Sequence, residues 1–183
     1  HNTVGTVEKA RLRSELGSWI TFTSNGDVLG PGTQTAGREI YLYNAVAGTF
    51  TKVTTTPGGE SHSGSRVTDS TFAGGRPDAF AFVSTGDLDP GADNSDGNPE
   101  IFVYEVLSGE IHQLTNTLPP VVNAEPYASD SFKCLVFTST GDLDNNDGSD
   151  DGNLGIGASN PDGSQEVFLY TVADSGDFPN QGY

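Results

Sequence analysis

The chain of 183 residues is long enough for one domain with a sizeable core, and its 24 glycines and 10 prolines indicate many turns. It carries 25 acidic against 8 basic residues, a formal charge of −17, which excludes nucleic acid as a partner because nucleic acid attracts cationic surfaces. No apolar run approaches the roughly 20 residues that cross a bilayer, so we expect no membrane insertion.

Two sequence motifs recur three times along the chain. The first is an apolar run that ends in Ser-x-Gly-Asp, and it occupies residues 19–27, 79–87 and 135–142. The second begins at or near a glutamate, ends in tyrosine, and occupies residues 38–43, 99–104 and 165–170. The anchor residues Phe22, Phe82 and Phe137 are 60 and 55 residues apart. A period of this size indicates like supersecondary units that stack on one another.

The middle repeat predicts four strands, at Arg66–Thr71, Ala79–Ser84, Glu100–Glu105 and Glu110–Thr115. The second and third are almost wholly apolar, so both of their faces should be covered. The fourth alternates, which is typical of a half-exposed outer edge. Stacked four-stranded units of this kind are typical of β-propeller blades. A jelly roll or sandwich also fits the strand spacing, but the tandem repetition does not favour it.

The same pattern predicts first strands near Lys9–Ser14 and Ala124–Ser129, and a last fourth strand at Asp177–Tyr183. We therefore expect an all-β chain forming a single domain, 1–183, of three four-stranded antiparallel blades. The predicted boundaries of these blades are about 5–54, 63–115 and 123–183.

The middle repeat resembles the TolB-like (WD-like) β-propeller repeat family. Asp96–Tyr104 reads DGNPEIFVY, Gln113–Thr115 reads QLT, and Pro126–Ser131 reads PYASDS. The last stretch is similar to the family's P-x-x-S-x-D-G pattern, with one residue fewer between serine and aspartate and with Ser131 in place of glycine. The first repeat departs from the family, because no DGN precedes Glu39. The resemblance implies a propeller of six to eight blades. It also implies secretion or a periplasmic location, and a role in protein binding or as a lid beside a separate hydrolase domain.

The loops between the second and third strands hold the densest acidic clusters. Calcium takes six to eight oxygen ligands from carboxylates, amides and backbone carbonyls, and these loops supply that inventory. Without a cation, so many carboxylates in one loop would repel one another. The predicted Ca²⁺ ligands are Asp87, Asp89, Asp93, Asn94, Asp96, Asn98, Asp142, Asp144, Asp147, Asp150, Asp151 and Asn153.

The first repeat offers an internal comparison, because its loop has lost the intervening acids. Aspartate and asparagine also favour turns on their own account, since they bond to their own backbone. The acids that all three repeats retain are therefore predicted to tie the loop to the strand. They are Asp27, Asp87, Asp142, Glu39, Glu100 and Glu166.

Two functions remain open. No catalytic residue is assigned, because His1, His62 and His112 form no triad pattern and no hydrolase motif occurs. The first hypothesis is a calcium-stabilised, secreted or periplasmic module that binds a protein or glycan without catalysis. The alternative is a glycan-active hydrolase or lyase, or the propeller part of a hydrolase, using loop carboxylates.

Three blades fall short of a closed propeller and leave two apolar end faces. We expect two chains to close a six-bladed ring as a homodimer, because closed symmetry satisfies both faces. The alternatives are that the chain, which begins at His1, is a trimmed piece of a longer propeller, or that Ser61–Pro77 caps one face.

Overall fold

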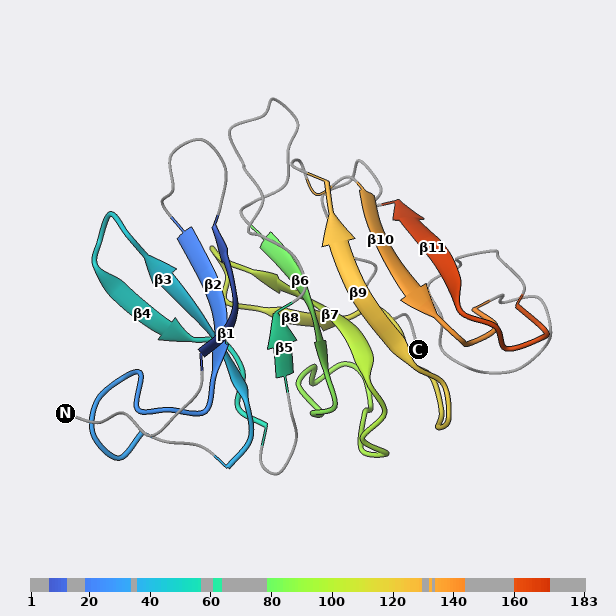
Figure 1. Ribbon diagram of the computed structural model, residues 1–183, viewed down its shortest axis with the longest axis horizontal. Helices are drawn as coiled ribbons and strands as arrows, with labels where there is room; N and C mark the ends of the chain where they lie inside the picture. Colours follow the sequence, from blue (N-terminus) through green and yellow to red (C-terminus); the bar gives the residue numbers. More distant parts are fainter. Residues whose placement is uncertain are drawn as a thin grey trace.

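The computed structural model describes residues 7–12, 19–33, 36–56, 61–63, 79–129, 132, 134–143 and 160–171, and the regular elements in these ranges are all strands. They form three small antiparallel sheets, which follow one another in sequence order along the length of the molecule (Figure 1). Within the described ranges, no helix has the length and apolar character needed to span a bilayer. The predicted all-β class is confirmed.

Each sheet is a meander built around one long central hairpin. The first sheet has the order β1-β2-β3-β4, with β1 at Val7–Leu12, β2 at Trp19–Ser24, β3 at Glu39–Asn44 and β4 at Thr49–Lys52. The middle sheet has the order β5-β6-β7-β8, with β5 at Ser61–Ser63, β6 at Ala79–Ser84, β7 at Glu100–Glu105 and β8 at Ile111–Gln113. The third sheet has the order β11-β10-β9, with β9 at Asn123–Ala128, β10 at Cys134–Ser139 and β11 at Glu166–Thr171.

The first strand of the middle sheet lies earlier than the sequence pattern predicts. This first strand is β5, which pairs with β6 so that Ser61 lies opposite Ser84. This three-residue strand is polar and carries no apolar alternation, so the pattern offered no signal for it. The predicted first strand at 66–71 and the predicted last strand at 177–183 lie outside the described residues.

The middle sheet is covered on both faces, and its residues alternate between two cores. Successive residues of a strand point to opposite faces, so β6 and β7 each supply both sets. The core shared with the third sheet contains Ala79, Ala81, Ile101, Val103, Leu114, Ala128, Phe132, Leu135, Phe137, Leu143, Phe168 and Tyr170. The core shared with the first sheet contains Ile40, Leu42, Phe80, Phe82, Phe102 and Tyr104.

The same stacked aromatic pair recurs at one position of every sheet. Its members lie directly opposite one another in the central hairpin. The ring centroids are 5.6 Å apart for Phe22 and Tyr41, 5.5 Å for Phe82 and Phe102, and 5.7 Å for Phe137 and Phe168. The three repeats of the sequence are therefore three copies of one packed unit.

The two end faces of the stack differ in exposure. On the first sheet, the outward-facing pair is buried, with Tyr41 at 0% and Phe22 at 9% exposure. On the third sheet, the outward-facing side chains Val167 and Leu169 are 72% and 56% exposed. Phe50 of β4, which contacts Phe22 on that first face, is 46% exposed, so the first sheet is covered only in part and the third sheet presents the more open face among the described residues.

Candidate metal centre

The acidic loops begin at a glycine turn that is built identically in all three repeats. The last serine of the central strand accepts a hydrogen bond from the glycine two residues later, at 3.0 Å in each case. The three pairs are Ser24 with Gly26, Ser84 with Gly86, and Ser139 with Gly141. Because the aspartate follows directly, this turn places Asp27, Asp87 and Asp142 at the same point of each loop.

In the middle loop, three of the predicted calcium ligands accept hydrogen bonds from nearby backbone. Asp93 accepts from the N–H of Ser95 at 3.0 Å, which lowers the pKa of that carboxyl. Asp96 accepts from the N–H of Asn98 at 3.0 Å. Asp89 accepts from Gly91 N–H and from the N–H of Gln113 on β8, both at 2.8 Å. These carboxylates therefore shape the loop and attach it to the sheet edge.

Asn94 is the most deeply buried predicted ligand of this loop, at 2% exposure. Its Nδ2 donates to the carbonyls of Gly86 at 3.2 Å and Asn98 at 3.1 Å, which closes the loop on itself. Both partners are carbonyl oxygens, so the orientation of the amide is determined. Its Oδ1 is buried and has no hydrogen-bond partner among the described residues. A buried carbonyl oxygen without a donor is costly unless a ligand completes it.

The third loop repeats this clamp at Asn160, which sequence reasoning missed. Asn160 Nδ2 donates to the carbonyls of Gly141 at 3.4 Å and Ser164 at 2.7 Å. Asp142 accepts from the N–H of Asn160 at 2.8 Å. The shared spacing Asn-x-Asp-Gly-x-x-Glu in residues 94–100 and 160–166 could have revealed it. Five predicted ligands of this loop lie outside the described residues: Asp144, Asp147, Asp150, Asp151 and Asn153.

The repeated glutamate of the second motif is structural in the first two repeats, but most of its partners lie in the segment after the fourth strand rather than in the acidic loop. Glu39 is 2% exposed and accepts from Thr54 Oγ1 at 2.6 Å, Thr56 N–H at 2.8 Å and Thr56 Oγ1 at 3.0 Å. Lys52 Nζ lies 3.6 Å from it. In the third repeat the equivalent Glu166 is exposed and accepts from Ser164 Oγ at 3.1 Å.

Glu100 makes the larger network of the two. It is fully buried and accepts from Thr115 Oγ1 and, at 2.7 Å each, from the N–H and Oγ1 of Thr117. Asn98 Nδ2 donates to it at 3.0 Å, and Asn123 Nδ2 from β9 donates at 2.9 Å. Burial raises the pKa of Glu100, although the hydrogen bonds oppose this shift. The network therefore ties the middle sheet to the third through Asn123.

Asn98, another predicted metal ligand, has its amide nitrogen committed to this network. In addition to Glu100, Asn98 Nδ2 lies 2.9 Å from the carbonyl and 2.7 Å from the Oγ1 of Thr117. Asp87, in contrast, is exposed at the start of the loop. The predicted ligands of the middle loop thus divide into buried residues that hold the loop and exposed carboxylates at its surface.

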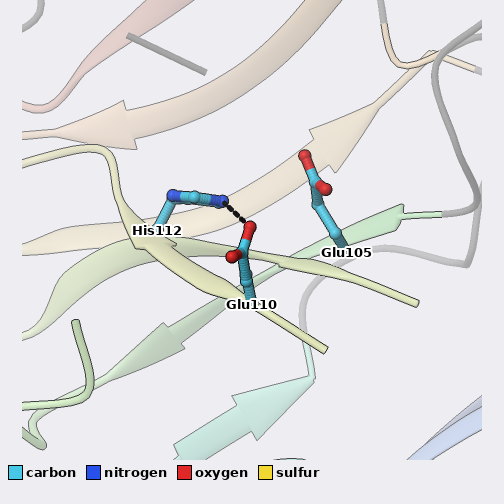
Figure 2. A group of neighbouring side chains, drawn as sticks. All are labelled: Glu105, Glu110 and His112. Atoms are coloured by element: carbon cyan, nitrogen blue, oxygen red, sulfur yellow. Dashed lines mark ion pairs between the residues drawn. The ribbon is translucent and has the colours of Figure 1, made fainter. Parts of the chain in front are cut away.

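Glu105, Glu110 and His112 lie close together at the β7–β8 hairpin, in a cluster that sequence reasoning did not identify. One ligand atom from each lies within 4.8 Å of the others, and within the described ranges this is the one such group of three. His112 Nε2 is 3.9 Å from Glu110 Oε2 (Figure 2). The triad is partly exposed and could hold a metal ion. The sequence could have revealed this cluster only through the predicted pairing of the strands that became β7 and β8, because this pairing places residues from both strands side by side.

No protein-family model matches the chain, and a search of curated proteins found no match.

Proposed function

We propose that this chain is a calcium-stabilised segment of a TolB-like β-propeller that binds a protein or glycan, without catalysis, in a secreted or periplasmic setting. The observation that carries the calcium proposal is the buried Oδ1 of Asn94, which has no partner among the described residues. It lies in a loop with four aspartates, Asp87, Asp89, Asp93 and Asp96.

Support for the propeller comes from how the sheets stack. The middle sheet presents its aromatic face to the first sheet and its aliphatic face to the third. The third sheet in turn presents Phe137, Phe168 and Tyr170 to the middle sheet. The middle and third sheets therefore each pack an aromatic face on the aliphatic face of the preceding sheet. This is the head-to-tail arrangement that generates rings or filaments.

Support for calcium comes from the oxygen inventory of the middle loop. A calcium ion takes carboxylate, amide and backbone oxygens at about 2.3–2.6 Å. The amide orientation of Asn94 leaves its oxygen as an acceptor, and exposed carboxylates such as Asp87 and Asp93 can rotate without unpacking a core. No three carboxylates of the described loop lie within 4.8 Å of one another, so binding would draw them together.

The test is thermal unfolding with millimolar calcium and with EDTA. Binding to the folded state alone stabilises by about 2.7 kcal/mol at a hundredfold excess of ion over its Kd. Calcium should therefore raise the Tm of the wild-type chain. Asp87→Asn should reduce that increase, whereas Glu125→Gln, which alters an exposed acid of β9 outside the acidic loops, serves as the matched control and should retain it.

Two results would contradict the proposal. An identical Tm in calcium and in EDTA would eliminate the calcium site. Turnover of any member of a glycan panel, lost when the loop carboxylates are replaced, would favour the hydrolase or lyase reading over a binding module.

A further inference from the structure

We propose that the β7–β8 hairpin carries a second metal site, chemically distinct from the acidic loop. Glu105, Glu110 and His112 would bind a divalent transition cation of the zinc class there. This site does not depend on the calcium proposal, because the two share no residue.

The pairing of the hairpin places the three side chains on one face. Val103 lies opposite His112, and Tyr104 lies opposite Ile111. Side chains alternate along each strand, so Glu105 on β7 shares a face with His112 and Glu110 on the β8 side. Figure 2 shows Glu110 and His112 pointing toward each other, with Glu105 projecting from the neighbouring strand.

The distances suit capture of an ion after a small rotation of the carboxylates. Zinc takes nitrogen and oxygen ligands at about 2.0–2.2 Å, so two ligand atoms of a tetrahedral site lie roughly 3.4 Å apart. The separation of His112 Nε2 and Glu110 Oε2 is 3.9 Å. Glu110 is exposed, so its terminal torsions can adjust without a packing cost.

The turn between the two strands holds the ligands in place. Gly109 N–H donates to the carbonyl of Glu105 at 2.9 Å, and Glu105 N–H donates to the carbonyl of Glu110 at 3.0 Å. Ser108 Oγ donates to Glu105 Oε2 at 3.1 Å and so orients that carboxylate from outside the site. Hydrogen bonds of this kind to metal-binding side chains preserve the ligand geometry.

The imidazole determines the class of ion. Calcium and magnesium select oxygen ligands, whereas imidazole favours zinc, nickel and copper. Two carboxylates and one imidazole leave a coordination position for water, as in zinc sites with three protein ligands. The ion would also neutralise two carboxylates that otherwise lie close together in a chain of charge −17.

Calorimetric titration of the untagged, metal-stripped chain with zinc chloride tests the site. Excess calcium should be present throughout, so that oxygen-only sites are already occupied. The expected result is one zinc ion per chain, and weakening of roughly tenfold or more in His112→Ala and in Glu110→Gln. His62→Ala, which removes a histidine from β5 of the same sheet, is the matched control and should bind zinc as the wild type does.

A second measurement uses the wild-type chain and so does not depend on folding of the variants. Zinc should shift the imidazole resonances of His112 in a nitrogen-edited NMR spectrum. Shifts confined to His1 or His62 would overturn the proposal. So would equal zinc affinity in the wild type and in a His112→Ala variant whose metal-free Tm is unchanged, because zinc would then be binding elsewhere.

Discussion

At the scale of single residues, two buried glutamates organise the polar interior. Glu39 and Glu100 each receive two threonine hydroxyls and one backbone N–H from the segment after the fourth strand. These donors come from the Thr-x-Thr sequences at 54–56 and 115–117. A buried carboxylate is tolerated only when its oxygens are satisfied in this way. The two glutamates therefore hold the last segments of the first and middle sheets to the central hairpins of those sheets.

Glu100→Gln should destabilise the fold more than Glu39→Gln. Glutamine replaces one acceptor oxygen by a donor, and Glu100 faces the amide nitrogens of Asn98 and Asn123 as well as a backbone N–H. Glu39 faces two rotatable hydroxyls, one such N–H and the flexible side chain of Lys52, whose Nζ is 3.6 Å away, so its partners can adapt more readily. We expect losses of about 1–3 kcal/mol for Glu100→Gln and about 1 kcal/mol for Glu39→Gln, measured by urea unfolding. A loss well below 1 kcal/mol at both sites would argue against the tying role.

The stability that Glu100 contributes should depend on pH with a definite sign. Its pKa is raised in the folded chain, chiefly by burial. The folded state therefore binds this proton more tightly than the unfolded state does. The advantage of wild type over Glu100→Gln should be greatest below the ordinary glutamate pKa of about 4.3, and should fall as pH rises through the raised value. Unfolding curves of the wild type and of Glu100→Gln, recorded in parallel from pH 4 to pH 7, measure this difference in stability. A difference that grows with pH would contradict a raised pKa of Glu100.

At the scale of elements, the glycine turn after β6 packs closely against the first sheet's last segment. A Cβ at Gly86 would lie 2.3 Å from Cγ2 of Thr56. Thr56 cannot retreat easily, because its N–H and hydroxyl are both bound to Glu39. A Cβ at Gly141 would similarly lie 2.9 Å from Cγ1 of Val121. The repeated glycine is thus required where successive repeats meet.

Gly86→Ala should cost about 1–3 kcal/mol of unfolding free energy, the usual range for overpacking. Gly91→Ala in the same loop is the matched control, since its Cβ would approach only the carboxylate of Asp89, at 3.3 Å. Thr56→Ser removes the clashing methyl group and keeps the hydroxyl. The double variant Gly86→Ala, Thr56→Ser should therefore recover much of the loss. Equal Tm values for the two single glycine variants would show that the close approach has no energetic consequence.

At the scale of the whole molecule, the outer face of the third sheet is an exposed apolar surface. It contains Tyr127, Val136, Val167 and Leu169. Val167 and Leu169 occupy the positions of Ile101 and Val103, which the third sheet buries completely. Contiguous exposed apolar surface of this kind marks an interaction site. The third sheet therefore provides an apolar surface for the expected self-association. On the outer face of the first sheet, Phe22 and Tyr41 are already buried.

Light scattering should give a mass above the 19.1 kDa of one chain. The double variant Val167→Lys, Leu169→Lys should return it to the monomer, because charged side chains oppose burial of this face. The matched control is Val46→Lys, Leu107→Lys, which alters two apolar residues at hairpin turns, away from the sheet face. Both residues are more exposed than Val167 and Leu169. A wild-type monomer, or equal dissociation by both double variants, would eliminate the face as the contact.

The sequence by itself determined the repeated unit and its buried strands. The apolar runs, the Ser-x-Gly-Asp turn and the glutamate of the second motif are local features, so the positions of β6, β7, β10 and β11 could be predicted. A structural role for Glu39 and Glu100 was also predicted, because these acids persist where neighbouring acids are lost, but the same reasoning included Glu166, which is exposed. The short polar strand β5 could not be recognised, because its pairing depends on an edge supplied by β6.

Only the tertiary structure decided which polar atoms meet. Asn123 reaches Glu100 from another sheet, 23 residues away, and Asn160 reaches the carbonyl of Gly141 across a long insertion. The triad of Glu105, Glu110 and His112 depends on strand register, and a shift of one residue would move His112 to the opposite face. Composition predicts where carboxylates are numerous, but the convergence of polar side chains on one point is set by strand register and by packing between segments distant in the chain.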